Sequence, residues 1–267
     1  MSPSRGAFVE LKAIIMDEDA YQAYRSVIVS PTLHSIWAEV YGEKFWPDLD
    51  PPWTQATIED VRFVADRLGA HGPSRFVDLG CGSGCFLRFA ARDRGQRIVG
   101  IDANPMAIRL AQERCAGLLD KISLQTGDIG ETGFPAATFD GAVSLDVLLF
   151  VPNKEKILRE VARILKPGAR FAGTTFELMA PSAAVSAPAF DAYPSAFKAA
   201  GFVVEAYEEA RDWRRLLEGV LPAVLAREAE LIREIHPIAW ARVRAWASSR
   251  PSELADSRRT RFCVRLP

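Results

Sequence analysis

A glycine-dense loop follows a short apolar run at residues 76–84, and this segment carries the clearest chemistry in the chain. The run ends in Asp78-Leu79, and glycines then occupy alternate positions at Gly80, Gly82 and Gly84. Glycine accepts positive φ and lets a backbone approach a ligand closely, and the residues that follow can begin a helix whose N-terminus faces that ligand. The segment predicts a strand, a nucleotide-binding loop and a helix.

The spacing of the glycines narrows the ligand. A dinucleotide fingerprint has the form G-x-G-x-x-G, whereas this loop reads G-x-G-x-G and places Cys85 where the third glycine would stand. A carboxylate at Asp78 has no role in holding an anionic pyrophosphate. It suits a ligand that carries an amino group.

A second acidic residue follows the next apolar run, about twenty residues after the loop. Residues 97–101 read as a buried strand, and Asp102 at its end can accept hydrogen bonds from both hydroxyls of a ribose. Pro105 then begins a helix, and Met106 offers a soft apolar surface to a flat base. The pattern favours a nucleoside ligand.

Val77-Asp78-Leu79-Gly80-Cys81-Gly82-Ser83-Gly84 resembles the first motif of the class I S-adenosylmethionine-dependent methyltransferases. The resemblance implies S-adenosylmethionine as the cofactor. It also implies an α/β fold, a Rossmann-like doubly wound sheet of seven mostly parallel strands with the last strand antiparallel, and helical lids over the site. The recurrence of strand, loop and helix from residue 76 to 175 agrees with binding at the carboxyl edge of such a sheet.

The same resemblance assigns further cofactor contacts. In the family, the acid after the third strand reaches the adenine amino group and the next residue packs on the ring, which implies these roles for Asp128 and Ile129. A single acidic residue at a strand end could equally be a helix cap or an ordinary loop residue. Four predicted strands in succession end near an acidic residue, however, and this recurrence favours a binding site. The expected cofactor contacts are Asp78, Gly80, Cys81, Gly82, Gly84, Asp102, Ala103, Met106, Gly127, Asp128, Ile129 and Leu145.

Residues 1–55 are expected to form an N-terminal helical lid, and residues 56–267 a methyltransferase core with a helical insertion at about 213–248. Prolines at 222 and 237 are expected to interrupt the insertion, and the fifth strand is expected over residues 170–175 after a Lys-Pro-Gly break. Lid and insertion should enclose the substrate, although aromatic side chains there could equally be plain core. The expected substrate-pocket residues are Tyr24, Trp37, Tyr41, Trp46, Phe150 and Tyr193.

A general base is harder to place. Many small-molecule members of the family carry a histidine pair just after the fourth strand, but Leu149-Phe150 stands there in this chain, which argues against histidine-assisted O-methylation from this segment. Asp146, at the end of the fourth strand, is the nearest base or substrate anchor. The weaker catalytic candidates are Glu177, His34 and His236.

Composition excludes several classes of function. The 267 residues are 49% hydrophobic with a formal net charge of −1, which gives no reason to expect nucleic-acid binding. No apolar run is long enough to span a membrane, and no signal-peptide pattern opens the chain, so we expect a cytoplasmic protein. The four cysteines form no metal or disulfide pattern. The oligomeric state has no signature in the sequence.

The segment Asp50-Pro51-Pro52-Trp53 matches the tetrapeptide of enzymes that methylate exocyclic amines of adenine, but there it ends the fourth strand, and here it precedes the first. We therefore set that function aside. The expected activity is S-adenosylmethionine-dependent methylation of a small molecule at N, O or C, in specialised metabolism. The alternatives are a cofactor-binding relative that catalyses cyclisation or decarboxylation, and methylation of a macromolecule.

Overall fold

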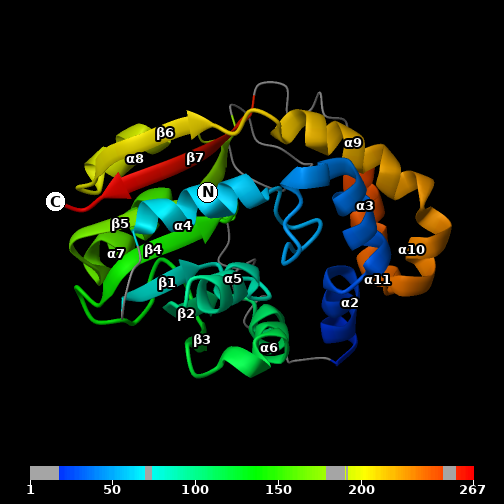
Figure 1. Ribbon diagram of the computed structural model, residues 1–267, viewed down its shortest axis with the longest axis horizontal. Helices are drawn as coiled ribbons and strands as arrows, with labels where there is room; N and C mark the ends of the chain where they lie inside the picture. Colours follow the sequence, from blue (N-terminus) through cyan, green and yellow to red (C-terminus); the bar gives the residue numbers. More distant parts are fainter. Residues whose placement is uncertain (1–17, 70–73, 179–189, 191, 249–256) are drawn as a thin grey trace, which may run out of the picture.

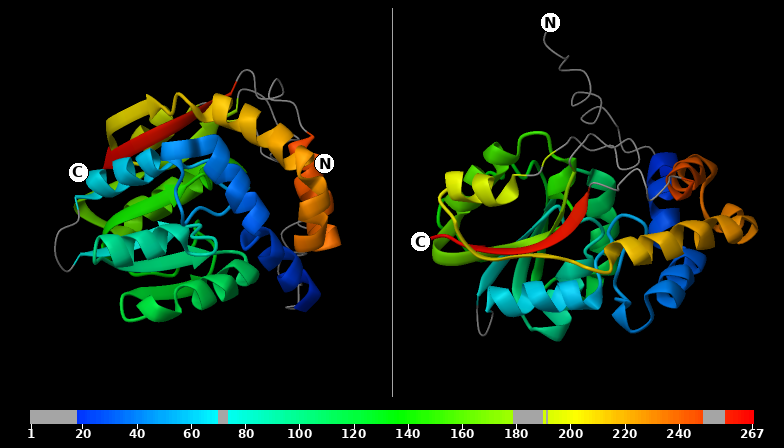
Figure 2. Two further views of the ribbon diagram at one scale, coloured as in Figure 1. Left: turned by 45° about the vertical axis from the view of Figure 1, so that its right-hand side comes forward. Right: turned by 90° about the horizontal axis from the view of Figure 1, so that it is seen from above.

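The computed structural model describes residues 18–69, 74–178, 190, 192–248 and 257–267. Two layers of helices enclose a sheet, and a group of helices stands beyond the end of the sheet toward which the parallel strands point (Figure 1). Figure 2 shows the same helical group at one side of the sheet from two further directions. Among the described residues, no helix is both long enough and apolar enough to cross a membrane.

The sheet has seven strands in the order β3-β2-β1-β4-β5-β7-β6. β7 runs antiparallel to both of its neighbours, and the other pairs are parallel. The order reverses between β1 and β4, which opens a crevice at their carboxyl ends where ligands of such sheets bind. The strands are β1 Arg75–Leu79, β2 Arg97–Asp102, β3 Ile122–Thr126, β4 Phe139–Leu145, β5 Leu165–Glu177, β6 Val203–Glu209 and β7 Arg258–Arg265.

Each face of the sheet is covered by its own helices. One large apolar cluster joins the sheet to α4, α5 and α6, and a second joins it to α7 and α8. The helices are α2 Glu18–Ile28, α3 Pro31–Tyr41, α4 Ile58–Leu68, α5 Cys85–Asp93, α6 Pro105–Arg114, α7 Lys154–Ile164, α8 Tyr193–Ala199, α9 Trp213–Ala226, α10 Glu228–Glu234 and α11 Pro237–Ala247, with short 3-10 turns at Gly42–Lys44, Ala116–Leu118 and Leu148–Phe150. The predicted fold class is confirmed.

Two local predictions were wrong. The fifth strand begins at Leu165, directly after α7, because Leu165 already pairs with Phe139 of β4. The Gly168 amide donates to the Leu266 carbonyl, which holds the Lys-Pro-Gly segment at the edge of the sheet. Pro222 does not interrupt the insertion, since α9 runs through it. Burial of the apolar face of α9 outweighs the roughly 3 kcal/mol that a proline costs inside a helix. The chain instead breaks at Arg227 and again before Pro237.

The helices beyond the sheet form one unit, here called the cap, made of α2, α3, α9, α10 and α11. Trp37 of α3 stacks on Trp246 of α11, with ring centroids 5.9 Å apart. Glu234 of α10 accepts hydrogen bonds from Ser30 and Thr32 at the start of α3. N-terminal and insertion helices, distant in sequence, therefore support one another.

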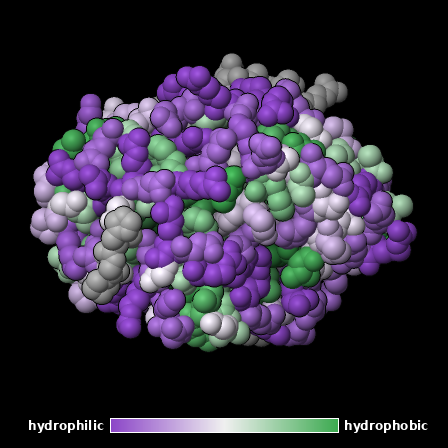
Figure 3. All heavy atoms as spheres, viewed as in Figure 1, coloured by the Kyte–Doolittle hydropathy of each residue, from purple (hydrophilic) through white to green (hydrophobic). Residues whose placement is uncertain are grey.

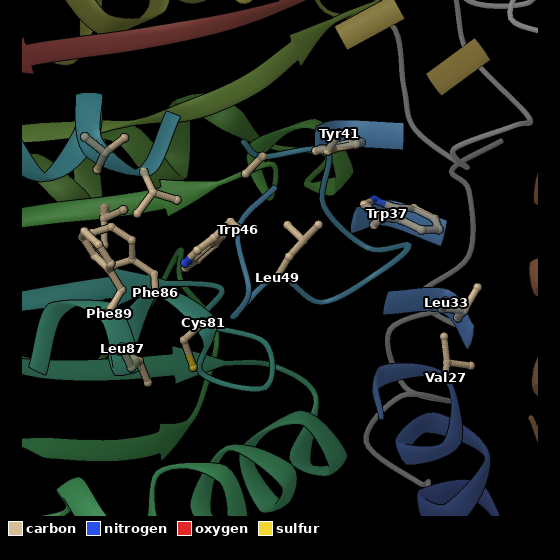
Figure 4. Close-up of a cluster of buried hydrophobic side chains, with 14 of the residues drawn as sticks. Val27, Leu33, Trp37, Tyr41, Trp46, Leu49, Cys81, Phe86, Leu87 and Phe89 are labelled. Atoms are coloured by element: carbon tan, nitrogen blue, oxygen red, sulfur yellow. The ribbon is translucent and has the colours of Figure 1, made fainter. Parts of the chain in front are cut away.

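The connection from the cap to α4 carries a small core of its own. Figure 4 shows Trp46 and Leu49 between the cap side chains and the phenylalanines of α5. Both are buried, and the Trp46 ring meets Phe89 edge to face at 6.4 Å. The outer surface in the view of Figure 3 is mostly hydrophilic, with small, separate hydrophobic patches. The apolar packing therefore fixes the connection against the sheet, where it can border the site.

Candidate active site

A cavity of about 730 Å³ lies where the carboxyl ends of β1, β2 and β4 meet the cap. This volume is in the range of small-molecule sites. Residues from the glycine loop, the strand ends, the connection at 50–54 and the helices α2, α6 and α11 line it. The side chains used below are Asp19, Tyr24, Asp50, Trp53, Thr54, Asp78, Cys81, Asp102, Asn104, Met106, Leu145, Asp146, Phe150, Ile238 and Arg242.

Asp78 is a buried carboxylate of β1 that lines the cavity. It precedes the last residue of the strand, only 3% of it is exposed, and no hydrogen bond or cation from the described residues reaches it. Burial, helped by the negative charge of Asp102, raises the pKa of Asp78 to about 8. An acidic group held in this way gains from a cationic ligand, because a nearby positive charge compensates the desolvated carboxylate.

Asp102 stands at the end of β2 and is already oriented by the backbone. Its two oxygens accept hydrogen bonds from the amides of Gly82 and Asn104 at 2.9 and 2.8 Å. Burial raises the pKa of Asp102, although both amide bonds oppose the shift. A carboxylate offers about four lone-pair sites, so two stay available for a pair of hydroxyl donors.

The glycines of the loop have two different roles, close packing inside the protein and close approach of a ligand. Gly80, Gly82 and Gly84 all have positive φ. A Cβ at Gly80 would lie 2.5 Å from Val147, so close packing excludes a side chain there. A Cβ at Gly82 would meet only Asp50, at 3.8 Å, which leaves its other side open to the cavity. Gly82 is the glycine that lets a ligand approach the backbone.

Asp50 joins the connection to the glycine loop, and sequence reasoning missed this contact. The Ser83 hydroxyl donates to Asp50 at 2.5 Å, and Arg114 at the end of α6 pairs with both residues. Asp50 is 4% exposed. The segment at 50–53 that the sequence set aside as an adenine-methylation motif therefore forms a wall of the cavity, with Trp53 at its opening. In the sequence, only the position of this segment just before the first strand could have indicated that it lies near the site.

Asp146 lies at the cavity, but its oxygens are already engaged. They accept from the Thr54 hydroxyl at 2.8 Å, the Gln55 amide at 3.0 Å and the Arg259 guanidinium at 3.1 Å. Asp146 also has a φ of +55°, a strained value for a residue other than glycine. These bonds tie Asp146 to the connection and to β7, which is the geometry of a positioning group. Its role as a base or substrate anchor stays a prediction.

Arg259 and Asp60 complete this buried network, which the sequence did not indicate. Arg259 donates to Asp60 at 2.8 Å, and the two residues are 1% and 0% exposed. Burial by itself raises the pKa of Asp60, but the charges of Arg259 and Arg261 outweigh it and lower the pKa. Because the three partners come from α4, β4 and β7, no local pattern could have joined them.

The other proposed catalytic residues lie away from the cavity. Glu177 is fully buried beside Arg258 on the far half of the sheet. The Nε2 atom of His34 lies 3.0 Å from the Ile28 carbonyl, and that of His236 lies 3.1 Å from Asp19, where His236 precedes α11. Of these three, only His236 has a partner that borders the cavity. None of them lines the cavity itself.

The aromatic residues divide in a similar way. Tyr24 and Phe150 line the cavity, and burial raises the pKa of Tyr24 well above its usual value. The others are packing residues in this structure. Trp37 and Trp46 are buried in the cap and the connection, Tyr41 donates to Gln55 at 3.0 Å, and Tyr193 packs between Phe190 and Phe197 behind the sheet.

Most of the expected cofactor residues come together. Asp78, Gly80, Cys81, Gly82, Asp102, Met106 and Leu145 line the cavity, whereas Gly84, Ala103, Gly127, Asp128 and Ile129 do not. Gly84 instead caps α5, and a Cβ there would lie 2.9 Å from the sulfur of Cys115. The Asp128 side chain is largely exposed and accepts from Gly130. Adenine contacts by Asp128 and Ile129 stay predictions.

Residues 77–173 match the family model described as "Methyltransferase domain". The chain is 26% identical over 200 residues to 27-O-demethylrifamycin SV methyltransferase of Amycolatopsis mediterranei, covering 68% of this chain and 74% of that protein. It is 32% identical over 122 residues to methyltransferase phqN of Penicillium fellutanum, covering 45% and 37%. It spans about a third to a half of most of the curated relatives that it matches.

Solved structures share the fold. The [4+2]-cyclase SpnF has a TM-score of 0.72 at 22% identity, covering 92% of this chain and 95% of its own. A phosphoethanolamine N-methyltransferase of Haemonchus contortus, in complex with S-adenosylhomocysteine, has a TM-score of 0.70 at 17% identity, covering 92% and 60%. The match over residues 77–173 identifies a methyltransferase domain in this chain, and the relatives support a class I S-adenosylmethionine-dependent methyltransferase with S-adenosylmethionine as its cofactor.

The cavity fits this cofactor by its own chemistry. The unpartnered, buried Asp78 suits the ammonium of the methionine end, and Asp102 has lone pairs free for the ribose hydroxyls. Met106 at the start of α6 lines the cavity together with Asp102 and Asn104. The cavity therefore offers complementary groups to both the methionine end and the ribose of S-adenosylmethionine.

The raised pKa of Asp78 predicts a pH-dependent affinity for the cofactor. A bound ammonium favours the carboxylate, so binding lowers the pKa of Asp78 and releases its proton below pH 8. We expect the affinity for S-adenosylhomocysteine to rise with pH by up to about tenfold per unit between about pH 6 and 8. Isothermal titration calorimetry in buffers of different ionisation enthalpy measures both the affinity and the proton release.

Asp78→Asn is the matched variant for this prediction, because it keeps the shape and removes the titration. Its residual pH dependence reports the other titrating groups, including the amino group of the ligand itself. An equal slope in the two proteins would show that Asp78 does not face the ammonium.

Proposed function

We propose that this protein transfers a methyl group from S-adenosylmethionine to a small, largely apolar molecule. The observation that supports this most strongly is the cavity in which the partnerless Asp78 and the pre-oriented Asp102 share one space with Trp53 and Phe150. The first pair can hold the cofactor, and the second pair offers an apolar surface beside it. Named methyltransferases of small molecules among the relatives support the same reaction.

When bound, the cofactor would supply an activated methyl group to a nucleophile of the acceptor. The protein contributes by positioning the acceptor and by excluding water from the cavity. Cap and connection surround the cavity and restrict water, and holding the acceptor in line about 3 Å from the methyl carbon supplies much of the acceleration. Since the Asp146 oxygens are occupied by Thr54, Gln55 and Arg259, we propose an acceptor that needs no strong base from that residue.

Specialised metabolism and the cytoplasm are the proposed setting. The rifamycin methyltransferase acts on a natural product by its name, and the formal net charge of −1 gives no support to nucleic-acid binding. The face of the molecule in Figure 3 mixes hydrophilic and hydrophobic residues without one dominant hydrophobic patch. A small-molecule acceptor agrees with these features better than a macromolecule does.

The direct test is incubation of the purified protein with methyl-labelled S-adenosylmethionine and a small-molecule extract of its source cells. We expect one or a few labelled products, each heavier than its precursor by one methyl group, and their fragments identify N, O or C as the acceptor atom. The Asp102→Ala protein is the control for labelling that does not depend on the site. A wild-type protein that binds S-adenosylhomocysteine but labels nothing would contradict methyl transfer and favour a non-methylating role.

A further inference from the structure

The charged residues that line the cavity are almost all acidic and almost all partnered. Asp50 pairs with Arg114, Asp146 with Arg259, and Asp102 with two backbone amides. Asp19 lies 3.1 Å from the Nε2 atom of His236. Asp78 has no such partner among the described residues, and under the proposed function it pairs with the ammonium group of the cofactor.

Arg242 of α11 is the single cationic side chain that lines the cavity within the described part of the chain. It is exposed, and no carboxylate of the described residues forms an ion pair or hydrogen bond with it. Its neighbour on the same helix, Arg244, differs in this respect because it donates to Glu228 at 2.8 Å. A guanidinium that has no ion-pair partner and lies at the rim of a binding cavity can bind an anionic group of a ligand.

An apolar rim accompanies this cation. Seven large apolar side chains are exposed in the described part of the chain: Val29, Trp53, Leu119, Phe150, Val203, Ile232 and Ile238. Three of them, Trp53, Phe150 and Ile238, line this one cavity, with 47%, 48% and 57% of their surfaces exposed. Exposed apolar groups gathered at one opening mark a binding surface.

The rim is built from three separate elements, so its composition is not the accident of one helix. Trp53 comes from the connection, Phe150 from the 3-10 turn after β4, and Ile238 from α11 one turn before Arg242. Residues four apart on a helix lie on the same face, which places Ile238 and Arg242 together. The cation is thus at the edge of an apolar opening and not isolated on a polar surface.

We propose that the methyl acceptor is an apolar molecule that carries an acidic group, a carboxylate or a phosphate, which Arg242 binds at the rim. The apolar body lies against Trp53, Phe150 and Ile238, and the acidic group pairs with the guanidinium, whose planar donors match such oxygens two at a time. This assignment rests on the proposed function, because it takes the cofactor to fill the part of the cavity at Asp78 and Asp102. It makes Arg242 a specificity residue for the acceptor.

Two fluorescent probes test the assignment without knowledge of the natural acceptor. Anilinonaphthalenesulfonate carries an apolar body and a sulfonate, and phenylnaphthylamine is its neutral counterpart. Both are titrated into protein saturated with S-adenosylhomocysteine. In Arg242→Gln the sulfonate probe should bind at least about tenfold more weakly, since a hydrogen-bonded charge is lost, while the neutral probe keeps its affinity.

Arg244→Gln is the matched control, because it removes the same charge from the same helix outside the cavity. It should leave both probes unchanged. Arg242→Lys keeps the charge without the paired donors and should fall between wild type and Arg242→Gln. Naphthoate and naphthyl phosphate, used as competitors, distinguish a carboxylate from a phosphate group, and displacement by neither would count against the proposal.

Several outcomes overturn the assignment. Equal affinity of wild type and Arg242→Gln for the sulfonate probe, or equal weakening of both probes, would show that charge at Arg242 does not bind the ligand. Loss of S-adenosylhomocysteine binding in Arg242→Gln would show that this residue holds the cofactor's carboxylate instead. Failure of the proposed function is separate, since it would appear as absent S-adenosylhomocysteine binding or absent methyl transfer in the wild-type protein.

Discussion

Replacing Arg259 with glutamine should lower the free energy of unfolding by about 3–5 kcal/mol, because removing one partner of a buried ion pair leaves the other charge uncompensated. Two carboxylates depend on this guanidinium, Asp60 and Asp146, and both are almost completely buried. Asp146 would also lose part of its hold on the connection at Thr54 and Gln55. The variant should therefore be less stable and should bind the cofactor product more weakly.

Urea unfolding measures the loss, and Arg265→Gln is the control on the same strand. Arg265 pairs with Glu205 at a partly exposed position, so its loss should cost less than about 1 kcal/mol. Without Arg259 the pKa of Asp60 should rise from its lowered value, and the stability deficit should shrink as the pH falls and Asp60 takes up a proton. If both variants lose a similar free energy of unfolding at neutral pH, the buried ion pairs of Arg259 do not stabilise the protein more than an exposed pair does.

Replacing Asp102 with alanine should weaken binding of S-adenosylhomocysteine on the order of a hundredfold or more. Hydrogen bonds to a charged group contribute about 1.5–3 kcal/mol each, and this carboxylate has free lone pairs for both ribose hydroxyls. The substitution also removes the acceptor of the Gly82 amide and so loosens the glycine loop. Calorimetric titration of the folded variant measures the change.

Asp140→Ala provides a fair comparison for this second variant. Asp140 lies at the opposite end of the sheet, at the start of β4, where it accepts from the Arg75 amide and pairs with Lys166. It should leave cofactor affinity unaltered. Unchanged affinity in a well-folded Asp102→Ala protein would remove Asp102 from the site.

The sequence predicted those features that depend on residues close together in the chain. The glycine loop and the acids Asp78 and Asp102 near the ends of β1 and β2 follow from spacing over a few residues. Each combines a local backbone requirement with one chemical group. Such features keep their meaning whatever packs around them.

The parts that could not be predicted depend on which distant surfaces meet. Trp37 is buried because α3 packs on α9 and α11, so its ring fills the cap and not the cavity. Arg242 was not singled out because nothing in its neighbourhood distinguishes it from Arg244. Asp50 and Arg114 are 64 residues apart, and their contact becomes visible only when the connection lies over the glycine loop.

The buried network has a consequence for how the protein is made. Its cation at position 259 is 199 residues from Asp60 and 113 residues from Asp146. During synthesis both carboxylates, and nearly the whole ligand-binding half of the sheet, leave the ribosome long before their partner exists. A nascent chain halted ahead of Arg259 therefore carries the cofactor motifs without the ion pairs that fix the wall beside them, and competence to bind should appear late, when β7 joins the sheet.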